Sequence, residues 1–141
     1  MWFIDTMKLY AILAVLAIFF LADCTSSYGP STTTVTKQTP VMQANVDITS
    51  SGFDAQTVTV LKGGTVTWTN RGSSTARVAS AVHPTHNAYP IGGGCVGSTF
   101  DTCRNINPGE SWSFTFSEVG SWKYHNHLNP SQTGTVNVVA G

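Results

Sequence analysis

Residues 108–124 read PGESWSFTFSEVGSWKY, and this stretch carries the clearest structural pattern in the chain. Aromatic residues occupy alternate positions across 112–116 and again across 122–124. Alternation at period two, in short runs rich in Trp, Phe and Tyr, predicts half-buried β-strands. Asn107-Pro108-Gly109 and Val119-Gly120 are turn signals that bound these runs. The stretch therefore predicts two strands of an all-β domain.

The same alternation recurs on the N-terminal and C-terminal sides of this stretch. Apolar residues alternate with polar ones across 46–48, 58–60, 66–68 and 136–138. Turn signals separate several of these runs, namely Ser51-Gly52, Gly63-Gly64 and Asn70-Arg71-Gly72. Six or seven short strands in about 100 residues predict two sheets packed face to face, as in a β-sandwich.

Composition excludes several classes of protein. The chain has 141 residues, with seven Lys plus Arg against seven Asp plus Glu, and 10% of its residues are charged. Zero net charge and the lack of a basic run argue against nucleic-acid binding, which requires phosphate-neutralising cations. A content of 41% hydrophobic and 11% aromatic residues is enough to fill a core, so the low charge does not indicate disorder.

The N-terminus has the pattern of an export signal. Lys8 precedes the apolar run LYAILAVLAIFFL at residues 9–21, which is shorter than the about 20 apolar residues that a membrane span needs. Either Met1 or Met7 could start the chain. The run ends in Leu-Ala-Asp before Cys24 and resembles a bacterial lipoprotein signal, which predicts lipidation of Cys24 and an exported, membrane-attached protein. An ordinary cleaved signal and an uncleaved anchor are the alternatives.

These patterns divide the chain into three parts. Residues 1–23 are expected to be a signal peptide. Residues 24–40 are rich in Ser, Thr and Pro and predict a flexible tether. Residues 41–141 are expected to form the folded β-domain.

The segment between Ala79 and Ile106 departs from the alternating pattern. It is rich in Pro, Gly and Cys. A loop of this length inside a small domain usually has a function or is held in place by a cross-link. Cys95 and Cys103 flank seven residues within it. In an exported protein this pair predicts a disulfide, with metal ligation and free thiols as the alternatives.

The four histidines of the chain fall in two close pairs. His83 and His86 form the motif His-Pro-Thr-His, and His125 and His127 flank one asparagine. Imidazole nitrogen suits copper, zinc and nickel, so two pairs that meet would form an all-nitrogen metal site. A surface or loop-capping role is the alternative for each single histidine.

Several landmarks resemble the cupredoxin family, which includes plastocyanin- and azurin-like proteins. They cover nearly the whole domain and are TVTWTN at 65–70, PGESWSF at 108–114, GSWKY at 120–124 and GTV at 134–136. The resemblance implies a Greek-key β-sandwich of about seven strands that holds one copper ion at one end.

The ligand positions implied by the resemblance hold other residues. Asn126 stands at the position of the copper-binding cysteine, Asn129 at that of the histidine, Gln132 at that of the methionine, and Ala76 at that of the early histidine. The chain therefore resembles a divergent group that pairs HPTH with the motif YHNHLNP at 124–130. In this interpretation the four histidines rebuild a copper site in the same end region of the sandwich.

The strand pattern raises a question about this site. If the strand through Trp122 and Tyr124 continues, Asn126 points inward, and His125 and His127 point outward. The two histidines could then bind a metal only if the loop that carries His83 and His86 folds over that outer face.

We expect an exported copper-binding protein with a non-blue site that binds one Cu(II), with zinc as a possible occupant and Asp101 or water as additional oxygen ligands. Copper handling or electron transfer would follow, through a partner protein that the sequence does not identify. The competing hypotheses are a copper-dependent oxidoreductase similar to superoxide dismutase and a metal-free interaction module. No nucleophile or general acid–base motif favours another enzyme.

Overall fold

The computed structural model describes residues 38–141, and every regular element in this range is a β-strand. Within these residues no helix is long and apolar enough to cross a membrane. The expected signal peptide at 1–23, the lipidation of Cys24 and most of the tether at 24–40 lie outside the described residues.

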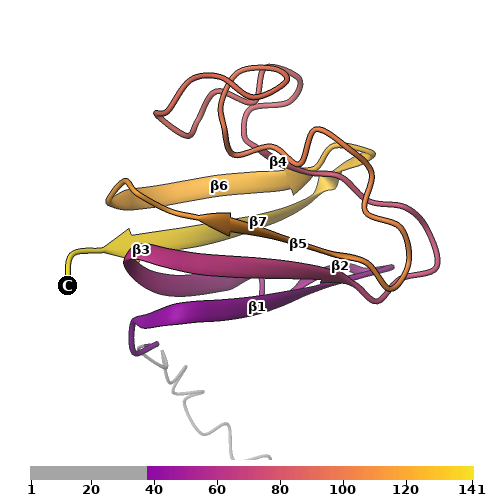
Figure 1. The fold of residues 1–141 in the computed structure, drawn as a ribbon. Coiled ribbons are helices and arrows are strands. Elements are labelled where there is room, and N and C mark those ends of the chain that lie inside the picture. Colours follow the sequence, from indigo (N-terminus) through magenta and orange to yellow (C-terminus); the bar gives the residue numbers. More distant parts are fainter. Residues whose placement is uncertain (1–37) are drawn as a thin grey trace, which may run out of the picture. The chain divides into compact units, whose positions relative to one another are not determined.

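Seven strands form one mixed sheet, in the order β2-β1-β3-β7-β6-β4, with β5 paired to β3. They are β1 (Val41–Thr49), β2 (Gly52–Asp54), β3 (Thr57–Asn70), β4 (Val78–Ser80), β5 (Ser111–Thr115), β6 (Gly120–Asn126) and β7 (Asn129–Val139). The β1–β3 and β3–β7 pairs are parallel, and the others are antiparallel. Figure 1 shows β6 and β7 on one side of the domain and β1 and β3 on the other. This architecture confirms the predicted all-β fold.

The two layers are joined through β3 rather than built from separate sheets. Gly63-Gly64, which the sequence predicts as a turn between two strands, lies inside this one 14-residue strand. The part before it pairs with β7 and, at Val60, with the start of β1, and the part after it pairs with the rest of β1 and with β5. Gly63 has a φ of 82°, and a Cβ on Gly64 would lie 2.7 Å from the carbonyl oxygen of Leu61. The two glycines therefore let the strand change direction without ending.

An aromatic cluster fills the space between the layers. Trp68 of β3 is fully buried and packs against Phe100, Trp112, Phe116 and Tyr124, with ring centroids 5.3 to 6.4 Å apart. Tyr124 comes from β6, so this core fixes which face of β6 points inward. The residues of β6 that alternate with Tyr124 are left facing away from the core.

The long segment between β4 and β5 is anchored in this core. Tyr89, Phe100 and Ile106 are buried members of the hydrophobic cluster, although they belong to no strand. In Figure 1 this segment, coloured red to orange, passes over β4 and β6. Hydrogen bonds from the Ala81 amide to the Lys123 carbonyl (2.9 Å) and from the Ser80 amide to the Phe100 carbonyl (2.8 Å) hold it there. The segment also reaches the outer face of β6, where the rings of His83 and His86 lie 5.4 and 5.1 Å from the ring of His125, and we call it the covering segment.

Candidate metal centre

The four histidines meet on the outer face of β6. His83 and His86 come from the covering segment, His125 from β6, and His127 from the turn that follows β6. The distances between their ring centroids range from 4.8 to 6.3 Å. The two sequence pairs thus form one cluster, although about 40 residues separate them along the chain.

The strand register explains how His125 reaches this cluster. β6 continues to Asn126, so Tyr124 and Asn126 share the inner face and His125 takes the outer one. Because the covering segment lies over it, His125 is nonetheless 3% exposed. Its partner in β4 is Ala79, and on the other side Ala79 bridges to Asp101. Ala79 of β4 thus lies between His125 of β6 and Asp101 of the bridged segment.

The donor atoms are close enough to share one ion. Ring nitrogens of His83, His125 and His127 all lie within 4.8 Å of one another. His86 adjoins this group, because its Nε2 lies 2.9 Å from Nδ1 of His127. The Nε2 of His125 is buried and has no hydrogen-bond partner among the described residues. A buried ring nitrogen without a partner is costly unless something else binds it, and a metal ion would satisfy it.

The surroundings of His125 and His127 favour neutral imidazoles. Burial, together with the neighbouring His86, His83 and His127, lowers the pKa of His125 to about 4. Partial burial, Arg77 and the other histidines lower the pKa of His127 as well. A neutral imidazole has the lone pair that a metal needs, so these two groups present ligand nitrogens at neutral pH without first losing a proton.

Asp101 lies beside the cluster but is fully engaged by other groups. Its Oδ2 is 2.6 Å from Nδ1 of His86 and 3.0 Å from Nη2 of Arg77. Its Oδ1 accepts from Nε and Nη2 of Arg77, both at 3.1 Å, and from the Cys103 amide at 2.8 Å. Burial raises the pKa of Asp101, but these hydrogen bonds outweigh it and leave the pKa lowered. The carboxylate therefore contacts a histidine instead of offering a free oxygen to a metal, which differs from the role expected from the sequence.

A disulfide joins Cys95 and Cys103, with Cα atoms 5.5 Å apart. The two sulfurs bind one another and so do not act as thiolate ligands. Arg77 Nη2 lies 3.1 Å from Sγ of Cys95. The disulfide thus adjoins the same arginine that pairs with Asp101.

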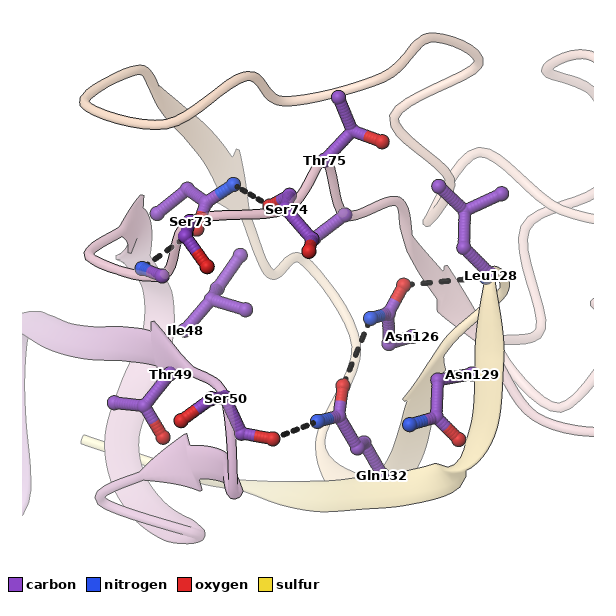
Figure 2. Close-up of a pocket in the computed structure, with 13 residues that line it drawn as sticks. Ile48, Thr49, Ser50, Ser73, Ser74, Thr75, Asn126, Leu128, Asn129 and Gln132 are labelled. Carbon is purple, nitrogen blue, oxygen red and sulfur yellow. Dashed lines mark hydrogen bonds between the residues drawn. The ribbon is translucent and has the colours of Figure 1, made fainter.

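The positions that the family resemblance implied as copper ligands gather elsewhere, around a cavity of about 230 Å³ on the inner face of β6. Ala76, Asn126, Asn129 and Gln132 all line it, and its described lining holds no His, Cys or Met. Figure 2 shows Asn126, Gln132 and Ser50 linked in a row. Asn126 Nδ2 donates to Gln132 Oε1 (2.8 Å), and Gln132 Nε2 donates to the Ser50 carbonyl (3.1 Å). Amide hydrogen bonds thus occupy the position where the resemblance implied copper ligands, and His125 lies on the opposite face of the same strand.

A second cavity, of about 340 Å³, borders the histidine cluster. His83 and His125 line it, together with Val82, Lys123 and Pro130. It is open to solvent, and Val82 is exposed. Small molecules in solution can therefore approach the exposed His83.

Sequence reasoning did not identify Arg77 or the contact between Asp101 and His86. Arg77 precedes β4 and is an unremarkable cation in the sequence, and Asp101 lies in a segment without periodicity. The β-bridge to Ala79 helps to place Asp101 beside the cluster.

The sequence matches no protein-family model and no curated protein. Solved structures do match it. A novel purple cupredoxin from Nitrosopumilus maritimus is 23% identical with a TM-score of 0.56, and the match covers 68% of this chain and 99% of that one. An amicyanin variant in its reduced state is 26% identical with a TM-score of 0.53, covering 69% of this chain and 82% of that one. A second amicyanin variant, in its oxidised state, is 25% identical with a TM-score of 0.54 and the same coverage.

These neighbours confirm the cupredoxin fold that the sequence landmarks predicted. The chain is thus a cupredoxin-like β-sandwich with a histidine cluster on the outer face of β6.

Proposed function

We propose that the chain is a copper-binding protein in which His83, His86, His125 and His127 hold one ion. The observation that carries the proposal is the convergence of all four histidines of the chain on one face of β6. The buried Nε2 of His125, which has no partner among the described residues, supports a ligand there. A metal ion bound at that atom would satisfy it.

The residues fit copper in its oxidised form. Imidazole suits Cu(II), and nitrogen ligands favour tetragonal geometry, although zinc accepts the same ligands. No thiolate is available within 38–141, because Cys95 and Cys103 form the disulfide. The centre is therefore expected to lack the intense colour of a copper–thiolate bond.

Copper binding and handling fits this donor set better than rapid electron transfer. Bound copper would supply a one-electron couple, as the oxidised and reduced states of the amicyanin structures suggest for the fold. An all-nitrogen site disfavours Cu(I), so each redox cycle would require rearrangement of the ligands. Electron transfer with a redox partner protein remains the second role of the same centre.

The site would lie outside the cytoplasmic membrane if the N-terminal pattern is a signal. The apolar run at 9–21 and Cys24 support export followed by lipid attachment. The tether at 24–40 would then hold the β-domain away from the membrane surface.

One observation favours a copper-dependent oxidoreductase as an alternative. The cavity of about 340 Å³ that His83 and His125 line would admit a small substrate to the metal. A superoxide or oxidase assay on copper-loaded protein separates this function from copper handling. A rate no greater than that of free copper would exclude the enzyme.

Elemental analysis of the native protein, purified without chelators or added metal, tests the main proposal. We expect about one copper per chain, and Cu(II) titration of the stripped protein should saturate at one equivalent. A chain that carries no transition metal and binds none would overturn the proposal and favour a metal-free interaction module.

A further inference from the structure

Asp101 accepts hydrogen bonds from the Arg77 guanidinium and the Cys103 amide, and it also contacts the ring of His86. Its side chain is fully buried, and its two oxygens face Arg77, the Cys103 amide and the ring of His86. An ionised carboxylate offers only acceptors, so it satisfies every one of these groups. The neutral amide of Asn would have to turn an N–H toward one of the donors. A carboxylate therefore satisfies all of these groups, whereas the amide of Asn would lose at least one of the hydrogen bonds.

The backbone on both sides holds this carboxylate in place. Phe100 is buried in the core, and the Thr102 amide donates to the Val78 carbonyl at 2.9 Å. Cys103 is tied by the disulfide to Cys95, and its amide is the group that donates to Asp101. These anchors leave Asp101 little freedom, so the ring that it contacts is positioned by the fold and not by a mobile side chain.

His86 lies between the carboxylate of Asp101 and the ring of His127. Its side chain is fully buried, and its amide donates to the Val82 carbonyl at 2.8 Å. Nδ1 lies 2.6 Å from Oδ2 of Asp101, while Nε2 points to His127 at 2.9 Å. Because Asp101 only accepts, the proton of a neutral His86 is placed on Nδ1 and the lone pair on Nε2. The lone pair thus faces the other histidines.

We infer that Asp101 is a positioning residue that fixes the tautomer and orientation of His86, so that Nε2 of His86 serves as a metal ligand. The inference rests on the proposed copper centre for its consequence but not for its geometry. Carboxylate partners of this kind orient metal-binding histidines, and their loss typically weakens metal affinity by roughly 10- to 100-fold.

The first test needs no metal. Long-range proton–nitrogen NMR correlations on the stripped, full chain report which ring nitrogen of His86 carries the proton. We expect the Nδ1–H tautomer in the native protein. An Nε2–H tautomer would overturn the inference whether or not the chain binds copper.

The second test compares Asp101→Asn with the control variant Asp47→Asn. Asp47 is an exposed carboxylate of β1 that pairs with Arg71. We expect Asp101→Asn to weaken Cu(II) binding by about 10- to 100-fold and to change the nitrogen hyperfine pattern of the electron paramagnetic resonance spectrum. Asp47→Asn should change neither the affinity for Cu(II) nor the hyperfine pattern. Thermal unfolding verifies that both variants fold, and if Asp101→Asn does not, the tautomer measurement alone decides.

The two proposals fail in different ways. If the native chain binds no copper while His86 is the Nδ1–H tautomer, the proposed function fails and the positioning role stands. If the native chain binds copper and a folded Asp101→Asn variant binds it equally well with an unchanged spectrum, the positioning role fails.

Discussion

His125 and Asn126 are neighbours in the sequence, and their side chains lie on opposite faces of β6. His125 joins the histidine cluster under the segment between β4 and β5. Asn126 faces the inner cavity and donates to Gln132. The position that the family resemblance implied for a copper thiolate and the proposed copper centre therefore lie on opposite faces of one strand.

Loss of the Gln132 side chain should destabilise the fold without affecting the metal. Gln132→Ala leaves the buried Nδ2 of Asn126 without its acceptor, which costs about 1–3 kcal/mol. Urea unfolding of the metal-free protein measures this loss, and copper stoichiometry should stay at its native value. A Gln132→Ala variant that no longer binds copper would show that the inner face contributes to the site.

The metal-free protein should lose stability in mild acid. The pKa of His125 is about 4 in the folded chain against an ordinary value of 6.5, because burial and then His86, His83 and His127 disfavour its charged form. Between these values the unfolded state binds more protons, so the free energy of unfolding falls as pH decreases from about 6.5 to about 4. Melting temperatures across this range should show a smaller decline in His125→Gln. Parallel pH profiles for the two proteins would rule out His125 as the source.

Removal of the disulfide should affect both stability and the centre. The bond spans a sequence separation of 8 residues, and its loss is expected to cost about 2–3 kcal/mol. Because the Cys103 amide holds Asp101, the Cys95→Ser, Cys103→Ser double variant should also bind Cu(II) several-fold more weakly. Alkylation of the native protein without reductant should leave both cysteines unlabelled. Free labelling of either one would contradict the disulfide.

Mass spectrometry of the membrane fraction tests the N-terminal prediction. Cleavage before Cys24 with an acylated cysteine is expected from the signal pattern at 9–24. A secreted product with an unmodified N-terminus at another residue would exclude the lipoprotein.

The fold could be predicted because its signals are local. The alternation across 112–116 and 122–124 depends only on neighbouring residues, and both stretches form strands. The Gly63-Gly64 turn signal was misleading because glycines also permit a strand to bend. β3 continues through them, since partner strands on both sides supply its hydrogen bonds.

The histidine site could be predicted only in part from the sequence. Residue type identified the four histidines, and alternation indicated that His125 would point outward if the strand continued beyond Tyr124, which β6 does. The contacts of Asp101 with His86 and Arg77 link residues 15 and 24 positions apart across irregular backbone, so no periodicity could predict them. They follow from the tertiary packing that buries Phe100 beside Asp101.

The central claim is that the four histidines, and not the inner cavity, bind copper. Electron paramagnetic resonance of Cu(II)-loaded protein tests it most directly. The native chain is compared with two variants: a double variant that carries His125→Ala and His127→Ala, and the single variant Gln132→Ala. The native chain and Gln132→Ala should each bind one Cu(II), with nitrogen hyperfine structure and weak visible absorption. The double histidine variant should keep its fold and lose tight binding. Unchanged copper stoichiometry in that variant, or the intense visible band of a copper–thiolate bond in the native chain, would contradict the account.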